Sequence, residues 1–264
     1  MIVAVTQIDP WRITADGLSF GTFAHSIEQV QGVESVAARR YKGQRSYARH
    51  GDIPTFRSYY EAKTFPLMIT LGPWDPDGDI DHPTGYFGHL RKNWESLATV
   101  IGKRHGFIDL RRFVPDDAGE SVELQADAVV GRTVPVRGSV AVWRVLVEFI
   151  LPYPFWHELP KVEREAAMSH SFTTGGTAPI NDMVFTFAGD GTLSWGSVEL
   201  EVAGSSGAVT VDVGQRKVFQ GGELAMDLIR LSKAMDNWME WPPQTAITLS
   251  SDVNVAVDYY NARH

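Results

Sequence analysis

Residues 140–151 read VAVWRVLVEFIL and carry the clearest strand signal of the chain. Arg144 and Glu148 occupy even positions, whereas every odd position is apolar: Ala141, Trp143, Val145, Val147, Phe149 and Leu151. Because successive side chains of a strand point to opposite faces, this period of two predicts one buried face and one partly wet face. The stretch therefore indicates a β-rich fold around it.

The residues that follow, LPYPFW from Leu151 to Trp156, end this strand. Two prolines among aromatic residues cannot continue a central strand, so we interpret the segment as a rigid hinge. A chain of 264 residues has room for one large domain or two modest ones. We expect two, over residues 1–152 and 153–264.

The first of these domains is expected to be β-rich with one helix. Strands are predicted at Lys63–Leu71, at residues 107–114 and at residues 127–137, where Gly138 turns the chain into the long strand. A single apolar stripe predicts one amphipathic helix between them. The stripe consists of Leu90, Trp94, Leu97 and Ile101, with Thr84 as the expected N-cap and Gly106 after the cationic last turn Lys103–His105.

The second domain has the regular spacing of short strands and turns that is typical of a β-sandwich. Short β-branched or aromatic runs recur at residues 183–187, 197–202, 208–213 and 253–259, separated by glycine-rich turns. Two segments depart from this rhythm. Helical spacing of large apolar residues favours a helix over residues 223–239, with strands as the alternative, and residues 161–168 favour helix by propensity.

Composition excludes several classes of protein. The chain has no cysteine, which excludes disulfides, thiolate metal sites and cysteine nucleophiles. It has no run of about 18 apolar residues, so we expect no membrane span. Its first residues, MIVAVTQ, lack the basic and long apolar regions of a signal peptide.

The sequence contains no complete catalytic motif, so we expect neither enzymatic activity nor a bound cofactor. His157-Glu158 begins a zinc-protease motif, but Lys161 replaces the second histidine. Neither a phosphate-binding loop nor a serine nucleophile elbow is present. A β-rich glycosidase with dispersed carboxylates is the enzymatic alternative, and nothing in the sequence supports it.

Alternate carboxylates in Asp75–Asp81 (DPDGDID) are the candidate for a metal site. Such oxygens can surround a calcium ion. The pattern departs from the EF-hand, because Ile80 stands at the sixth loop position and Tyr86 where a bidentate glutamate is needed. We favour an acidic, solvated turn, since Asp, Pro and Gly are ordinary turn residues.

The charge is unevenly distributed. The net charge is −8, and residues 153–264 carry 7 Lys and Arg against 14 Asp and Glu. Residues 39–63 reverse this balance, with seven cations against two acids. Basic residues alternate there with aromatic ones, which suits either single-stranded nucleic acid or a protein interface. The overall acidity favours the interface, and its candidate residues are Arg39, Arg40, Tyr41, Arg45, Tyr47, Arg49 and Arg57.

The arrangement of these segments resembles the distal tail (Dit) proteins, also labelled minor tail proteins, of phages with long non-contractile tails. The resemblance covers nearly the whole chain and consists of spacing rather than signature residues. Its landmarks are residues 27–33, 45–57 with the His50-Gly51-Asp52 turn, 65–71, 107–112 after the helix, 143–149, 153–156, 179–187, 209–219, 247–249 and 253–264.

The resemblance implies an N-terminal belt domain, a C-terminal galectin-like β-sandwich and a structural role in the virion. Belt domains of such proteins form a hexameric ring at the tail tip, which joins the tail tube to the hub and adhesion device and lets DNA pass. Glycan binding does not transfer with the fold, since the His-x-Asn-x-Arg pattern of galectins is absent. The alternative function is a carbohydrate- or receptor-binding tail module that uses Trp195 or Trp238.

Overall fold

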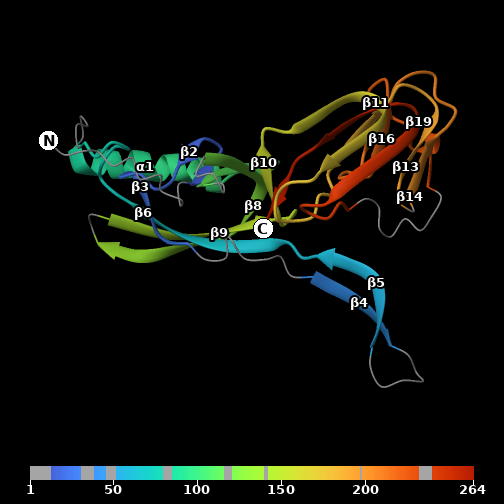
Figure 1. The fold of residues 1–264 in the computed structure, drawn as a ribbon. Coiled ribbons are helices and arrows are strands. Elements are labelled where there is room, and N and C mark those ends of the chain that lie inside the picture. The colour runs from blue at the N-terminus through green and yellow to red at the C-terminus, as the bar shows by residue number, and fades with distance from the viewer. Residues whose placement is uncertain are drawn as a thin grey trace. The chain divides into compact units, whose positions relative to one another are not determined.

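The computed structural model describes residues 13–30, 39–45, 52–79, 85–115, 121–139, 142–196, 198–231 and 240–264. Within these ranges, strands form two large curled sheets and a two-stranded one, and a single α-helix is present (Figure 1). The expectation of a mainly β protein with one amphipathic helix is confirmed. The chain divides into two compact units, one made of Met1–Arg40, Tyr59–Trp156 and His264, the other of Tyr41–Ser58 and His157–Arg263.

The sheet of the first unit is antiparallel and follows the order β2-β1-β7-β8-β9-β6-β3. In that order the strands are Leu18–Ser19, Ile13–Ala15, Ile108–Pro115, Ser121–Ser139, Val142–Leu151, Lys63–Leu71 and His25–Val30. Strand β6 has the predicted bounds, and β8 turns into β9 as a hairpin in which Ser139 pairs with Val142.

Strand β9 follows the predicted period of two over most of its length. Val145, Val147, Phe149 and Leu151 are buried. The prediction is wrong at Trp143, which is 40% exposed. Its indole lies at the end of the sheet and meets the edge of Trp94 at 6.2 Å between ring centroids. Among the described residues of the strand, the buried face therefore begins at Val145 and not at Trp143.

The predicted helix is α1, Gly85–Ile101. Leu90 and Leu97 are buried and Trp94 and Ile101 pack against the same core. The predicted C-terminus is wrong, because the helix ends at Ile101, where Gly102 N–H donates to the Ala98 carbonyl. Lys103 thus lies beyond the helix and pairs with Asp16, Nζ to Oδ2 at 2.8 Å. The predicted N-cap, Thr84, lies outside the described residues.

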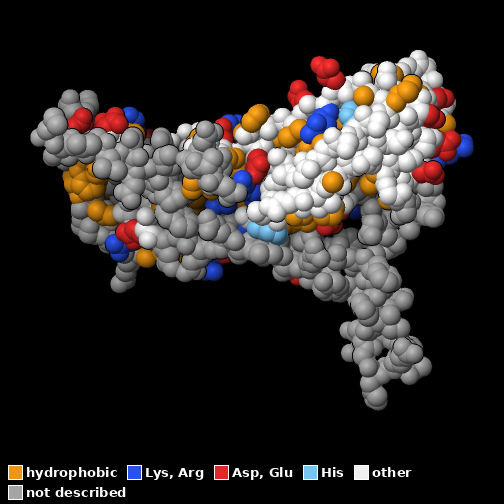
Figure 2. All heavy atoms as spheres, viewed as in Figure 1, with side chains coloured by type: hydrophobic (Ala, Val, Ile, Leu, Met, Phe, Trp, Pro, Cys, Tyr) orange, Lys and Arg blue, Asp and Glu red, His pale blue; other side chains and the backbone are white. Residues whose placement is uncertain are grey.

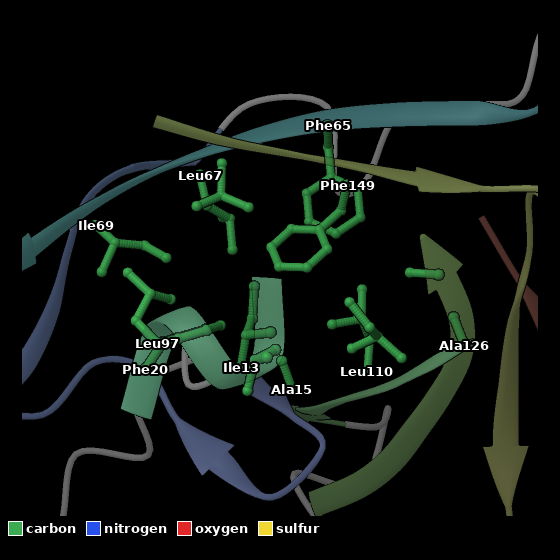
Figure 3. Close-up of a cluster of buried hydrophobic side chains, with 14 of the residues drawn as sticks. Ile13, Ala15, Phe20, Phe65, Leu67, Ile69, Leu97, Leu110, Ala126 and Phe149 are labelled. Atoms are coloured by element: carbon green, nitrogen blue, oxygen red, sulfur yellow. The ribbon is translucent and has the colours of Figure 1, made fainter. Parts of the chain in front are cut away.

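The core of the first unit lies between this helix and the sheet. Figure 3 shows Phe65, Leu67 and Ile69 of β6 pointing toward Leu97 of α1 and toward side chains of β1 and β7. Phe65 and Phe149 stack with their ring centroids 5.7 Å apart. Their burial removes large apolar surfaces from water, which is the main stabilising contribution in such a fold.

The second unit contains the other large sheet, in the order β17-β16-β15-β12-β19-β13-β14-β18, with β11 paired to β19. In that order the strands are Glu223–Leu224, Lys217–Gln220, Val209–Asp212, Val184–Phe187, Ala246–Tyr259, Gly191–Trp195, Val198–Val202 and Ile229–Leu231, and β11 is Val162–Thr173. Strand β10, Trp156–Leu159, pairs with β20, Ala262–Arg263. This curled sheet is compatible with the expected β-sandwich.

Two helix predictions for this unit are wrong where the structure describes them. Residues 161–168 lie mostly in β11, which pairs with β19 along its length. Residues 223–231 contain β17, the 3₁₀ turn Met226–Leu228 and β18. Pairing with neighbouring strands has overridden helical spacing and propensity there. Residues 232–239 lie outside the described part.

Candidate interaction surfaces

The basic stretch folds into two strands, β4 at Arg39–Arg45 and β5 at Asp52–Tyr60, which form a two-stranded sheet of their own (Figure 1). We call these two strands the basic ribbon. Arg39, Arg40, Tyr41 and Arg45 lie on β4 and Arg57 on β5, whereas Tyr47 and Arg49 lie outside the described residues. A two-stranded sheet is marginally stable alone in water. The ribbon is therefore the kind of element that gains from a partner.

A groove of about 1140 Å³ opens in the first unit. Four segments supply most of its lining: the β1–β2 turn, the residues that lead into β3, the turn at Trp74–Asp77 and one side of α1. Phe113 of β7 and Ser121 of β8 complete it. Sequence reasoning missed this groove, because its walls are far apart in the chain and each carries only ordinary turn or helix residues. Its lining mixes aromatic, hydroxyl, amide and charged side chains.

Buried hydrogen bonds fix the floor of the groove. Asn93 is 5% exposed, and its Nδ2 donates to the carbonyls of Gly72 and Trp74 at 2.9 and 2.7 Å. His25 donates from Nε2 to the Asn93 carbonyl at 2.9 Å. Burial lowers the pKa of His25, although the hydrogen bond opposes the shift, so burial favours the neutral imidazole. These hydrogen bonds tie α1 to the start of β3 and to the turn after β6.

An acidic turn forms one rim. Oδ1 of Asp75 accepts hydrogen bonds from the backbone N–H groups of Asp77, Gly78 and Asp79 at 3.0, 2.8 and 2.8 Å. These bonds, above all the one from Asp79, lower the pKa of Asp75 and keep it ionised. The described residues contain no cluster of three or more metal-ligating side chains, and Asp81 lies outside them. The geometry is that of a hydrogen-bonded turn, as favoured from the sequence.

Aromatic side chains stand beside this rim. Phe23 is 62% exposed and lies against the turn, where a Cβ on Gly78 would come within 3.2 Å of its ring. Trp74 folds back over Gly72, where a Cβ would lie 2.3 Å from Cε3 of the indole. Glycine at position 72 is therefore required by the packing of the groove wall.

The second unit buries a titratable pair that the sequence did not reveal. His157 Nε2 lies 3.1 Å from Asp182 Oδ2, and the imidazole stacks on Tyr260 with 5.0 Å between ring centroids. Burial lowers the pKa of His157 to about 4 and raises that of Asp182 to about 6, the latter with help from Asp212. Each shift favours the neutral form, so at pH 5 both side chains are uncharged. We assign the pair a structural role.

Other acidic side chains of the second unit already have partners. Asp258 pairs with Lys161 at 3.0 Å, Glu158 pairs with Arg263, and Asp190 accepts hydrogen bonds from the Gly204 and Ser205 backbone. Figure 2 shows further acidic side chains at the edge near β13 and β14, where Glu199 is exposed.

The aromatic residues expected for a sugar-binding module offer little support for one. Trp195 is half-buried and stacks on Phe185 at 6.1 Å between ring centroids, so one face of its indole is covered by the core. Trp238 lies outside the described residues. Among the described residues, no helix is long and apolar enough to cross a membrane.

Comparison with known proteins identifies relatives by structure and not by sequence. No protein-family profile matches this chain, and neither does any curated protein sequence. The crystal structure of the Dit protein of phage SPP1, described as a paradigm of the hub adsorption apparatus in phages infecting Gram-positive hosts, aligns with a TM-score of 0.64. The alignment covers 95% of this chain and 98% of the SPP1 protein at 14% identity.

Two structures of the phage P2 baseplate in its activated conformation, one with Ca and one with Sr, also align. Their TM-scores are 0.44 and 0.45 at 6% identity, which is too weak a likeness to support an argument. The SPP1 alignment extends over both units. The chain therefore has the fold of a phage distal tail (Dit) protein, the family that its sequence resembles.

Proposed function

We propose that this chain is a structural protein of a virion, located at the distal tip of a long non-contractile phage tail. The observation that carries the proposal is the likeness, over 95% of this chain, to the SPP1 Dit protein, which is described as a paradigm of the hub adsorption apparatus. The absence of a catalytic motif in the sequence agrees with a role in assembly rather than in chemistry.

In this role, six copies form a ring that connects the tail tube protein to the hub protein and leaves a bore for DNA. Repeating one heterologous contact around a rotation axis closes such a ring. Residues 1–152 act as the belt domain that makes the ring contacts, and residues 153–264 form the outer sandwich. The basic ribbon, together with the residues between its two strands, supplies one side of a subunit contact. The contact residues are Arg39, Arg40, Tyr41, Arg45, Tyr47, Arg49 and Arg57.

Charge reversal in the ribbon tests its part in assembly. The double variant Arg45→Glu/Arg49→Glu is expected to weaken self-association at low salt, and the loss should shrink at high salt as screening removes the electrostatic contribution. Sedimentation velocity over a concentration series measures the effect. Arg216→Glu, at an exposed turn of the second unit, is the control. Equal association of the double variant and the wild type would exclude the ribbon from the contact.

A further inference from the structure

We propose that the groove of the first unit receives the basic ribbon of a neighbouring copy of the same chain. The inference rests on the proposed ring and names the surface that completes its contact. It follows from two independent features of the molecule: a charged two-stranded sheet without a third strand among the described residues, and a hollow whose rim carries the opposite charge.

The ribbon brings a concentrated positive charge. Strand β4 reads RRYKGQR, with four cations in seven residues and no acid. Strand β5 adds Arg57 against a single acid, Asp52. A two-stranded sheet has no large buried face of its own. Docking into the groove would bury part of the ribbon and place its cations near carboxylates.

The acidic turn places two exposed carboxylates at the groove: Asp77 lines it, and Asp79 follows in the same turn. Oδ1 of Asp75 accepts hydrogen bonds from three backbone N–H groups. These bonds hold the turn in which Asp77 and Asp79 are exposed to solvent. No cation of the described residues pairs with Asp77 or Asp79 within 4 Å. Lys92 also lines the groove and opposes a basic guest, so the acidic turn is the part that attracts the ribbon.

The groove also offers aromatic surface for guanidinium and tyrosine side chains. Phe23 is 62% exposed beside the turn, and Trp74 forms the adjoining wall. Arginine stacks on aromatic faces while it pairs with carboxylates, and lysine does so less well. A strand with three arginines and a tyrosine suits a wall of this composition.

Charge alone does not separate the groove from the acidic second unit. Its Asp182, Asp190, Asp258 and Glu158 carboxylates are engaged within the unit, whereas Glu199 and Glu223 are exposed, which is why these two serve as the control below. A contact between ribbon and groove joins two different surfaces of one chain. Such a heterologous contact propagates around an axis and closes a ring, whereas a contact of one surface with itself stops at a dimer.

A charge swap tests the proposal. Asp77→Lys/Asp79→Lys should weaken self-association by about tenfold at low salt, since it replaces two exposed ion pairs of the contact by like charges. Arg39→Glu/Arg40→Glu should weaken it similarly. A chain that carries all four substitutions should recover most of the loss, because the opposite charges face each other again. Sedimentation velocity measures association, and circular dichroism verifies that each variant is folded.

Two further variants serve as controls. Lys92→Glu removes the opposing cation and should leave association unchanged or stronger. Glu199→Lys/Glu223→Lys reverses two exposed acids of the second unit and should leave association as in the wild type. If the second-unit control weakens assembly while the groove variant does not, or if the four-fold variant shows no recovery, the groove contact is overturned and the ring survives. A wild-type chain that never associates overturns both.

Discussion

At the scale of single residues, the buried pair His157–Asp182 makes stability depend on pH. The folded pKa of Asp182 is about 6, above its unfolded value of 3.8, so the folded state binds a proton that the unfolded state releases. The stability that protonated Asp182 contributes is therefore lost as pH rises through about 4 to 6 and stays lost above that range. His157 opposes this trend, because its folded pKa lies below 6.5.

Asp182→Asn isolates the carboxylate contribution. The amide is neutral at every pH, so the free energy of unfolding of the variant, relative to wild type, should rise by about 1.4 kcal/mol between pH 5 and pH 7.5. The His157 contribution is shared by both proteins and cancels in the difference. Urea denaturation at the two pH values measures the change. Asp227→Asn, at an exposed position, should give no such rise; a pH-independent difference for Asp182→Asn would contradict the assignment.

Some features of single residues could be predicted from the sequence, and others could not. Carboxylates in a DPDGD run predicted a turn, and the Asp75 hydrogen bonds form one. His157 and Asp182 are 25 positions apart, and only the fold brings them within 3.1 Å. Two residues so far apart in the chain form no local sequence pattern, so their contact cannot be predicted from a motif.

At the scale of elements, α1 gains its stability from the face that it buries against the sheet. Leu97 is fully buried in the core of the first unit, whereas Thr99 is exposed on the same helix. Leu97→Ala should lower the free energy of unfolding by about 2–5 kcal/mol, through lost burial and the cavity that remains. Thr99→Ala should change it by less than about 0.5 kcal/mol. Thermal denaturation compares them, and equal effects would argue against this packing.

Helices and strands with a strong hydrophobic period could be predicted from the sequence. Short segments whose structure depends on pairing with another strand could not. The alternation in β6 and β9 and the stripe of α1 each report one buried face, which is a local property. Residues 162–168 have helical propensity, yet β19 pairs with them and makes them a strand. The same holds for Glu223–Leu224, which pairs with β16. Tertiary partners decide such short segments.

At the scale of the whole molecule, the proposed ring uses two different surfaces of one chain, the basic ribbon and the groove. The ribbon was visible in the sequence as a basic and aromatic run, while the groove appears only when residues 17–26, 74–77 and 89–96 are brought together. Two unlike surfaces on each copy are what a ring of identical subunits requires. The proposed assembly thus follows from placement and charge rather than from a signature motif.

The most direct test of this account combines mass and images of one sample. The full-length chain, concentrated at low salt, is analysed by light scattering and by negative-stain electron microscopy. The account predicts closed rings with a central hole and a mass about six times the 29.3 kDa of one chain. A particle that keeps the mass of one chain at every concentration, with no rings in the images, would contradict it.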